Sequence, residues 1–83
     1  MDEKLFVSLC KNEVLEYIKS KGDSDITLDD VYVVWLCKIL QNNKALLSTN
    51  RLDGMYYEMT YNGRTREVYV DAYKKVENYT LVI

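Results

Sequence analysis

The spacing of the apolar residues changes at Gly22, and this change restricts the chain to a helix followed by a sheet. In residues 3–21, apolar side chains recur every three or four positions, which is the period of an amphipathic helix. Asp2 suits the N-cap of this helix, and Gly22 suits the left-handed residue that ends it. We expect its apolar stripe to pack inward; the stripe consists of Leu5, Phe6, Leu9, Cys10, Val14, Tyr17 and Ile18.

Beyond residue 30 the pattern is typical of strands. Residues 31–40 are almost continuously β-branched, aromatic or aliphatic, which predicts a central strand covered on much of both faces. The polar run Gln41–Lys44 is predicted to turn, and three further strands are expected at 44–49, 55–61 and 65–74. Residues 79–83 are predicted either to form a short fifth strand or to pack as a tail. The expected fold is α+β, a single domain over residues 1–83 with one N-terminal helix on a four-stranded or five-stranded antiparallel meander sheet.

The dipeptide Asn62-Gly63 is the strongest hairpin signal in the chain. A two-residue loop there sets Glu58 directly against Glu67, an unfavourable pair of like charges. A four-residue loop instead pairs Glu58 with Tyr69 and Thr60 with Glu67, and we prefer this register. Both registers place the same residues on the helix-covered face, namely Met55, Tyr57, Met59, Tyr61, Val68, Val70 and Ala72.

The other face of this hairpin is aromatic and acidic. Its candidate partner-binding residues are Tyr56, Glu58, Tyr69, Asp71 and Tyr73. Exposed tyrosines on a sheet also serve cross-strand packing, or they stack nucleic-acid bases. Because carboxylates rather than Lys or Arg stand between these tyrosines, a protein partner is favoured, and a homodimer is one form of it. Tyr32 and Lys38 join this face if Trp35 points into the core.

A nucleic-acid-binding function is the alternative. Its candidate residues are Lys44, Arg51, Arg64 and Arg66. Affinity for nucleic acid depends on neutralising phosphates, and small binders usually carry a basic excess. This chain has 11 Lys and Arg against 13 Asp and Glu, a net charge of -2. Overall charge therefore leans toward a protein partner.

Residues that commonly perform catalysis are missing. The chain has no histidine, which removes the commonest general base and a common metal ligand. Its two cysteines, Cys10 and Cys37, are too few for a zinc site and are expected to be reduced and buried. We therefore expect a protein that is not an enzyme, with no catalytic residues, no metal and no cofactor. No leader or membrane span is expected, and the bacterial cytoplasm is the predicted location.

Three segments of the chain resemble a family of small uncharacterised proteins encoded by phages and prophages of Gram-positive bacteria. The segments are VYVVWLCKILQNNKALLST, DGMYYEMTYNG and VYVDAYKK. The resemblance implies a small phage accessory protein and assigns no functional residue. Blocking a host defence component is one role consistent with it, and a part in phage replication or transcription is another.

Overall fold

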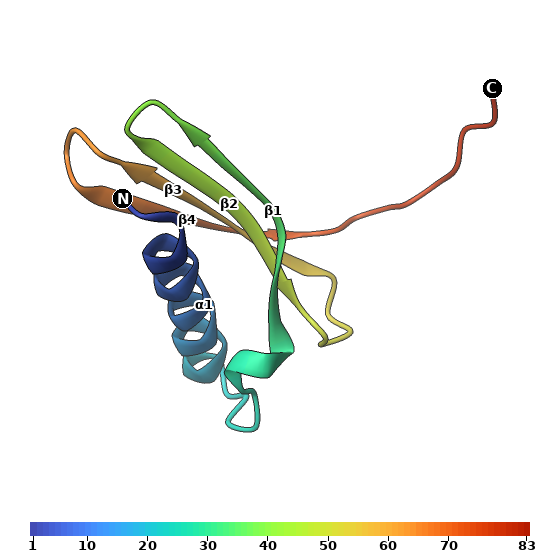
Figure 1. Ribbon diagram of the computed structural model, residues 1–83. Helices are drawn as coiled ribbons and strands as arrows, with labels where there is room; N and C mark the ends of the chain where they lie inside the picture. Colours follow the sequence, from blue (N-terminus) through green and yellow to red (C-terminus); the bar gives the residue numbers. More distant parts are fainter.

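A computed structural model describes residues 1–83 and contains one helix and one four-stranded sheet (Figure 1). Helix α1 spans Glu3–Ser20, and a 3-10 turn, η1, spans Leu28–Asp30. Strands β1 (Val31–Ile39), β2 (Asn42–Thr49), β3 (Met55–Asn62) and β4 (Glu67–Lys74) follow. They lie in the order β1-β2-β3-β4, and each pair of neighbours is antiparallel. The predicted α+β architecture, with an N-terminal helix and a four-stranded meander, is confirmed.

The ends of α1 follow from its terminal residues. Asp2 Oδ2 accepts a hydrogen bond from the Leu5 N–H at 3.1 Å and so satisfies one of the free amides of the first turn. The helix ends at Ser20, and Gly22 then takes a φ of 108°. Because such a φ strains residues with a Cβ, Gly22 is well suited to turn the chain toward η1.

The core lies between α1 and the central strands. Phe6, Cys10, Val14 and Ile18 are buried on the helix, and they belong to one cluster with Ala45, Leu47, Tyr57 and Met59 of the sheet. Within the predicted apolar stripe, Leu5 and Leu9 are wrongly placed, since they are 60% and 37% exposed. A single helix on a sheet buries only the side that touches the strands, so its flanks stay in water.

The prediction that the first strand is central and covered on both faces is wrong. Strand β1 is an edge strand, and one of its faces has no covering layer. The register with β2 shifts between Val33 and Trp35, which marks a β-bulge. Because the bulge adds one residue to the alternation, Trp35 joins Tyr32 on the uncovered face and Lys38 falls on the helix side.

Two turns also differ from the prediction. The first turn is Leu40-Gln41, because Leu40 itself adopts a left-handed φ of 57°, and β2 therefore begins at Asn42 rather than at Lys44. The β3–β4 loop has four residues, but they are 63–66, with Arg66 at φ 59°. Glu58 consequently faces Asp71, not Tyr69. The predicted division of β3 and β4 residues between the two faces is confirmed, since a register shift of two keeps the faces.

Residues 75–83 do not form a fifth strand. They continue from β4 as an extended segment that leaves the rest of the chain (Figure 1). The Lys75 N–H donates a hydrogen bond to the Gly54 carbonyl oxygen at 2.8 Å, and residues 76–83 make no backbone hydrogen bond. Because Lys75 is held in line with β4, the chain does not turn back onto its own sheet.

Candidate binding face of the sheet

The face of the sheet opposite α1, which we call the open face, carries aromatic side chains from β1, β3 and β4. The strand registers arrange its residues in rows: Tyr32 with Ser48; Trp35 with Leu46, Glu58 and Asp71; Cys37 with Lys44, Thr60 and Tyr69; and Tyr56 with Tyr73. Tyr32, Trp35, Tyr69 and Tyr73 are between 40% and 52% exposed. Four large aromatic side chains thus stand half in solvent on one side of a thin molecule.

All five predicted partner-binding residues lie on this face. Tyr56 and Tyr73 are directly opposite each other on β3 and β4, as are Glu58 and Asp71. Tyr69 is one row away from Asp71, and its hydroxyl donates to Glu67 Oε1 at 3.4 Å. The structure therefore brings together the residues that the hairpin pattern grouped.

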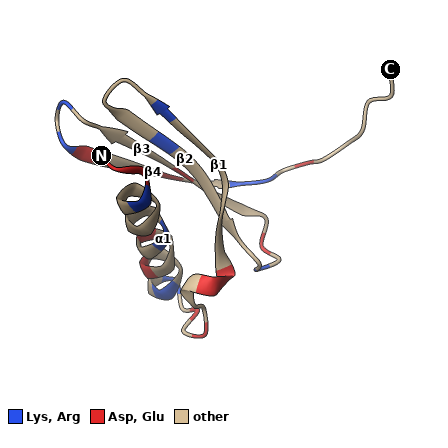
Figure 2. Cartoon of the chain, viewed as in Figure 1, with Lys and Arg blue, Asp and Glu red and all other residues tan.

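The charges of the open face are unbalanced. Glu58 and Asp71 are like charges on facing positions, an arrangement that disfavours pairing of the two strands. Lys44 Nζ lies 3.8 Å from Glu58 Oε2, whereas Asp71 forms no salt bridge. Figure 2 shows the acidic residues at the start of β4 and the basic residues of the adjoining loop. Glu58 thus has a cation beside it in the middle of the face, and Asp71 has none.

Sequence reasoning missed Trp35, which stands in the same row as Glu58 and Asp71. The β-bulge that exposes Trp35 has no signature in the run VYVVWLCKI, because every residue there suits either face of a strand. The residue type itself was informative, since Trp is enriched among the residues that dominate protein interfaces. Cys37 lies one row further along, exposed rather than buried as predicted, while Cys10 is buried as expected.

The four predicted nucleic-acid contacts do not converge. Lys44 lies on the open face beside Glu58, and Arg64 and Arg66 lie in the β3–β4 loop. Arg51 follows β2 at the other end of that strand, where its Nε donates to Asp23 Oδ2 at 2.7 Å. Its Nη1 also lies 3.9 Å from Asp30 Oδ2. The Arg51 charge is thus paired within the protein.

Two aspartates of the connector after α1, Asp23 and Asp30, have structural partners. The hydrogen bond from Arg51 lowers the pKa of Asp23 below its ordinary value. Hydrogen bonds from the Thr27 backbone and from Asn50 lower the pKa of Asp30. Asp30 Oδ2 accepts a hydrogen bond from the Thr27 N–H at 2.9 Å, which forms a capping box at the start of η1. Nowhere in residues 1–83 do three acidic or cysteine side chains gather as metal ligands would.

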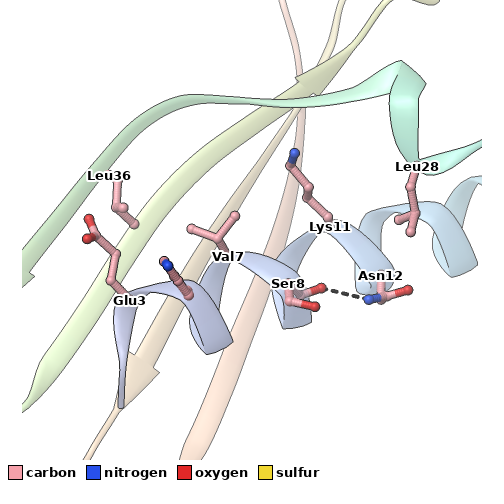
Figure 3. A pocket seen from close by; sticks show the side chains of 8 residues that line it. Glu3, Val7, Ser8, Lys11, Asn12, Leu28 and Leu36 are labelled. Carbon is pink, nitrogen blue, oxygen red and sulfur yellow. Dashed lines mark hydrogen bonds between the residues drawn. The ribbon is translucent and has the colours of Figure 1, made fainter.

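A separate cleft of about 430 Å³ lies between α1 and the start of the sheet (Figure 3). Val7, Leu28 and Leu36 give it an apolar lining, and its polar residues are Glu3, Lys4, Ser8, Lys11 and Asn12. Asn12 Nδ2 donates to the Ser8 carbonyl oxygen at 2.8 Å, as the dashed line in Figure 3 marks. The cleft is on the helix side of the sheet and therefore does not belong to the open face.

Asn43 is buried on the helix side of β2, and its Oδ1 has no hydrogen-bond partner. The prediction placed Asn43 in a turn, where its side chain would be in water. In the structure it pairs with Lys38 and Tyr61 within the sheet. An unsatisfied buried acceptor costs stability, so Asn43 is a polar exception within the core.

No helix of this chain is both long enough and apolar enough to cross a membrane. No curated protein and no solved structure matches the sequence. The model of one protein family matches residues 7–83, which include most of α1 and the whole sheet. The chain therefore belongs to DUF6275, a family of unknown function.

Proposed function

We propose that this protein is a non-catalytic accessory protein that binds another protein through the open face of its sheet. The observation that carries the proposal is the exposure of Trp35, Tyr32, Tyr69 and Tyr73 on one uncovered face. Tyr and Trp supply large, rigid contact area together with a polar group, and they are enriched at protein interfaces. A second layer of structure from a partner would cover this face as α1 covers the other.

The charges on the open face indicate what the partner presents. Asp71 has no cation of its own, and Lys44 reaches only Glu58. A partner that brings an Arg or Lys side chain to this row relieves the repulsion between the two carboxylates. Such charge complementarity increases both the association rate and the specificity of binding. Because salt screens the attraction between the charges, we expect the affinity for the partner to fall as the salt concentration rises.

The resemblance to phage-encoded proteins supports a particular setting. A phage accessory protein works in the cytoplasm of the bacterial host, where its partner is a host or a phage protein, and inhibition of a defence component is one such role. Nucleic-acid binding during phage replication or transcription has weaker support, because Arg51 is paired with Asp23 and lies at the opposite end of the sheet from Arg64 and Arg66.

The test is affinity capture from a lysate of the bacterial host with two matched variants. Tyr32→Ala plus Trp35→Ala removes the β1 part of the open face, while Glu13→Ala plus Glu16→Ala changes an equally exposed part of α1. We expect the first variant to lose at least nine-tenths of a captured protein and the second to keep it, with circular dichroism showing that both fold. Equal capture by both variants would show that the open face is not the binding surface.

A nuclease-treated lysate separates the two functions. A protein partner stays bound after treatment, whereas a nucleic-acid partner disappears. Direct titration with single-stranded and double-stranded DNA at low salt then completes the comparison, since the nucleic-acid function predicts binding that falls steeply as salt rises. Loss of that binding in Lys44→Ala and Arg64→Ala would support the alternative and contradict the protein-binding proposal.

A further inference from the structure

Residues 76–83 form the most exposed apolar segment of the protein. Val76, Tyr79, Leu81, Val82 and Ile83 are each between 78% and 110% exposed. The segment is extended, makes no backbone hydrogen bond and runs on from β4 away from the helix (Figure 1). A run of this kind has the composition of a strand but lacks a neighbouring strand.

The same molecule has a strand edge that can receive such a segment. Strand β4 is the last strand of the sheet, so one side of its backbone is unpaired. Its pairing with β3 is regular from Glu67 to Lys74, whereas the other edge strand, β1, is interrupted by the bulge after Val33. Bulges hinder edge-to-edge pairing, and a regular edge permits it.

The helix side of β4 is only partly covered. Val68 is only partly buried, Val70 is 42% exposed, and Ala72 is exposed. Helix α1 packs mainly against β1 and β2, and its Tyr17 ring contacts Tyr57 of β3, so β4 lies at the margin of the helix-covered face. Another strand placed beside β4 would bring apolar side chains next to these residues.

We propose that two copies of this chain form a dimer in which residues 76–83 of each copy pair with β4 of the other as a fifth strand. The segment cannot reach its own β4 in this conformation, because the Lys75 hydrogen bond to Gly54 carries the chain straight on past the point where a hairpin would turn. When two copies exchange their segments about a two-fold axis, the exposed segment 76–83 of each copy pairs with the free edge of β4 of the other. This contact is a form of β-strand addition.

A two-fold axis at Lys75 gives a defined register, since residues 67–83 are then a single extended strand in each copy. Antiparallel pairing about this centre sets Val68 of one copy opposite Val82 of the other, and Tyr69 opposite Leu81. The first pair lies on the helix side of the sheet and the second on the open face. Lys75 of each copy faces Lys75 of the other, and Glu77 of each copy lies diagonally across from the opposite Lys75, so the two carboxylates offset the repulsion between the lysines.

The oligomeric state and an engineered disulfide test the inference. Sedimentation of the full chain should give about twice the 9.8 kDa of one copy, and deletion of residues 76–83 should give a monomer whose circular dichroism keeps the helix signal. Because the deleted residues make no hydrogen bond within the chain, the remainder is expected to fold. A full chain that stays monomeric, or a dimer that survives the deletion, would overturn the proposal.

The disulfide tests the register even if the deletion variant aggregates. In a Cys37→Ser background, Tyr69→Cys plus Leu81→Cys should give a covalent dimer on oxidation. Residues 69 and 81 are about 40 Å apart within one extended chain, at about 3.3 Å per residue, so they can link only between copies. The matched pair Tyr69→Cys plus Val82→Cys points to opposite faces and should not link. No linked dimer, or equal linking by both pairs, would refute the exchange.

The dimer does not depend on the proposed function, and the variants keep the two apart. Tyr32→Ala plus Trp35→Ala lies on β1, at the sheet edge opposite β4, and should leave the dimer intact while removing partner capture. Loss of the dimer in this variant, with retention after deletion of residues 76–83, would show that the copies associate through the open face instead.

Discussion

The Gly63 amide donates a hydrogen bond to Asn42 Oδ1 at 3.1 Å, which joins the β3–β4 loop to the β1–β2 turn at one end of the sheet. The two loops are so close that a Cβ on Gly63 would collide with the carbonyl oxygen of Gln41. Glycine is therefore required at position 63 because two backbones approach each other closely there. The sequence Asn62-Gly63 suggests another reason, a left-handed turn.

Gly63→Ala should destabilise the protein by about 1–3 kcal/mol, the usual cost of forcing an extra group into a packed site. The measurement is urea denaturation followed by circular dichroism. Thr65→Ala in the same loop is the control, since Thr65 is exposed and its replacement should change the free energy of unfolding by no more than about 0.5 kcal/mol. Equal stability of Gly63→Ala and wild type would contradict the close approach of the two loops.

The ion pair between Arg51 and Asp23 should make stability depend on pH in the acid range. The folded pKa of Asp23 lies below its unfolded value of about 3.9, so the carboxylate contributes stability that is present above that pH and is lost as pH falls through the folded pKa. Asp23→Asn should lower the melting temperature at pH 7, and the difference from wild type should vanish toward pH 2.

Thermal denaturation at a series of pH values measures this effect. Glu16→Gln is the matched control, because Glu16 is an exposed carboxylate of α1 without a salt bridge. Its melting temperature should follow that of wild type at every pH. A deficit in Asp23→Asn that persists unchanged at pH 2 would show that the lost stability does not come from the charged carboxylate.

Met59→Ala should cost about 2–5 kcal/mol, since Met59 is fully buried between the helix and the sheet and its truncation leaves a cavity. Leu52→Ala is the control, because Leu52 projects from the β2–β3 loop and is fully exposed. Chemical denaturation should separate the two variants clearly. Similar stability of both would mean that Met59 is not in the core.

The parts of this fold that were predictable are those in which local pattern and global packing agree. Alternation along β3 and β4 identified Met59 as buried and Tyr73 as exposed, and both assignments hold because a register shift of two residues preserves the faces. The pairing of Glu58 was not predictable in the same way, since it depends on which loop residue adopts a left-handed φ. Arg66 does so, and arginine gives no signal for it.

The candidate site was predictable on the β3–β4 side and not on the β1 side. Tyr56, Tyr69 and Tyr73 follow from alternation around one hairpin. Trp35 depends on a bulge, which is a property of how β1 pairs with β2, and all neighbouring residues of β1 suit either face. The run 31–40 was interpreted as a strand buried on both faces because it is apolar, but composition alone does not distinguish a buried strand from an exposed aromatic surface.

The two cysteines should differ sharply in reactivity, and this difference gives a probe of the open face. Burial raises the pKa of Cys10 to about 12, so at pH 8 almost none of it is thiolate, while Cys37 is exposed beside Lys44. Ellman's reagent should therefore titrate one thiol per chain in the native state and two in guanidinium chloride. Two thiols reacting at one rate in the native protein would contradict the burial of Cys10.

A bulky maleimide on Cys37 should then reduce capture of the partner at least tenfold, because it occupies the row next to Trp35. Cys37→Ser treated with the same reagent should bind normally, which separates occlusion of the face from damage to the protein. If labelled wild type binds as well as unlabelled, the partner does not cover the β1–β2 part of the open face. The binding surface would then lie around Tyr56 and Tyr73, which are outside the row that contains Cys37.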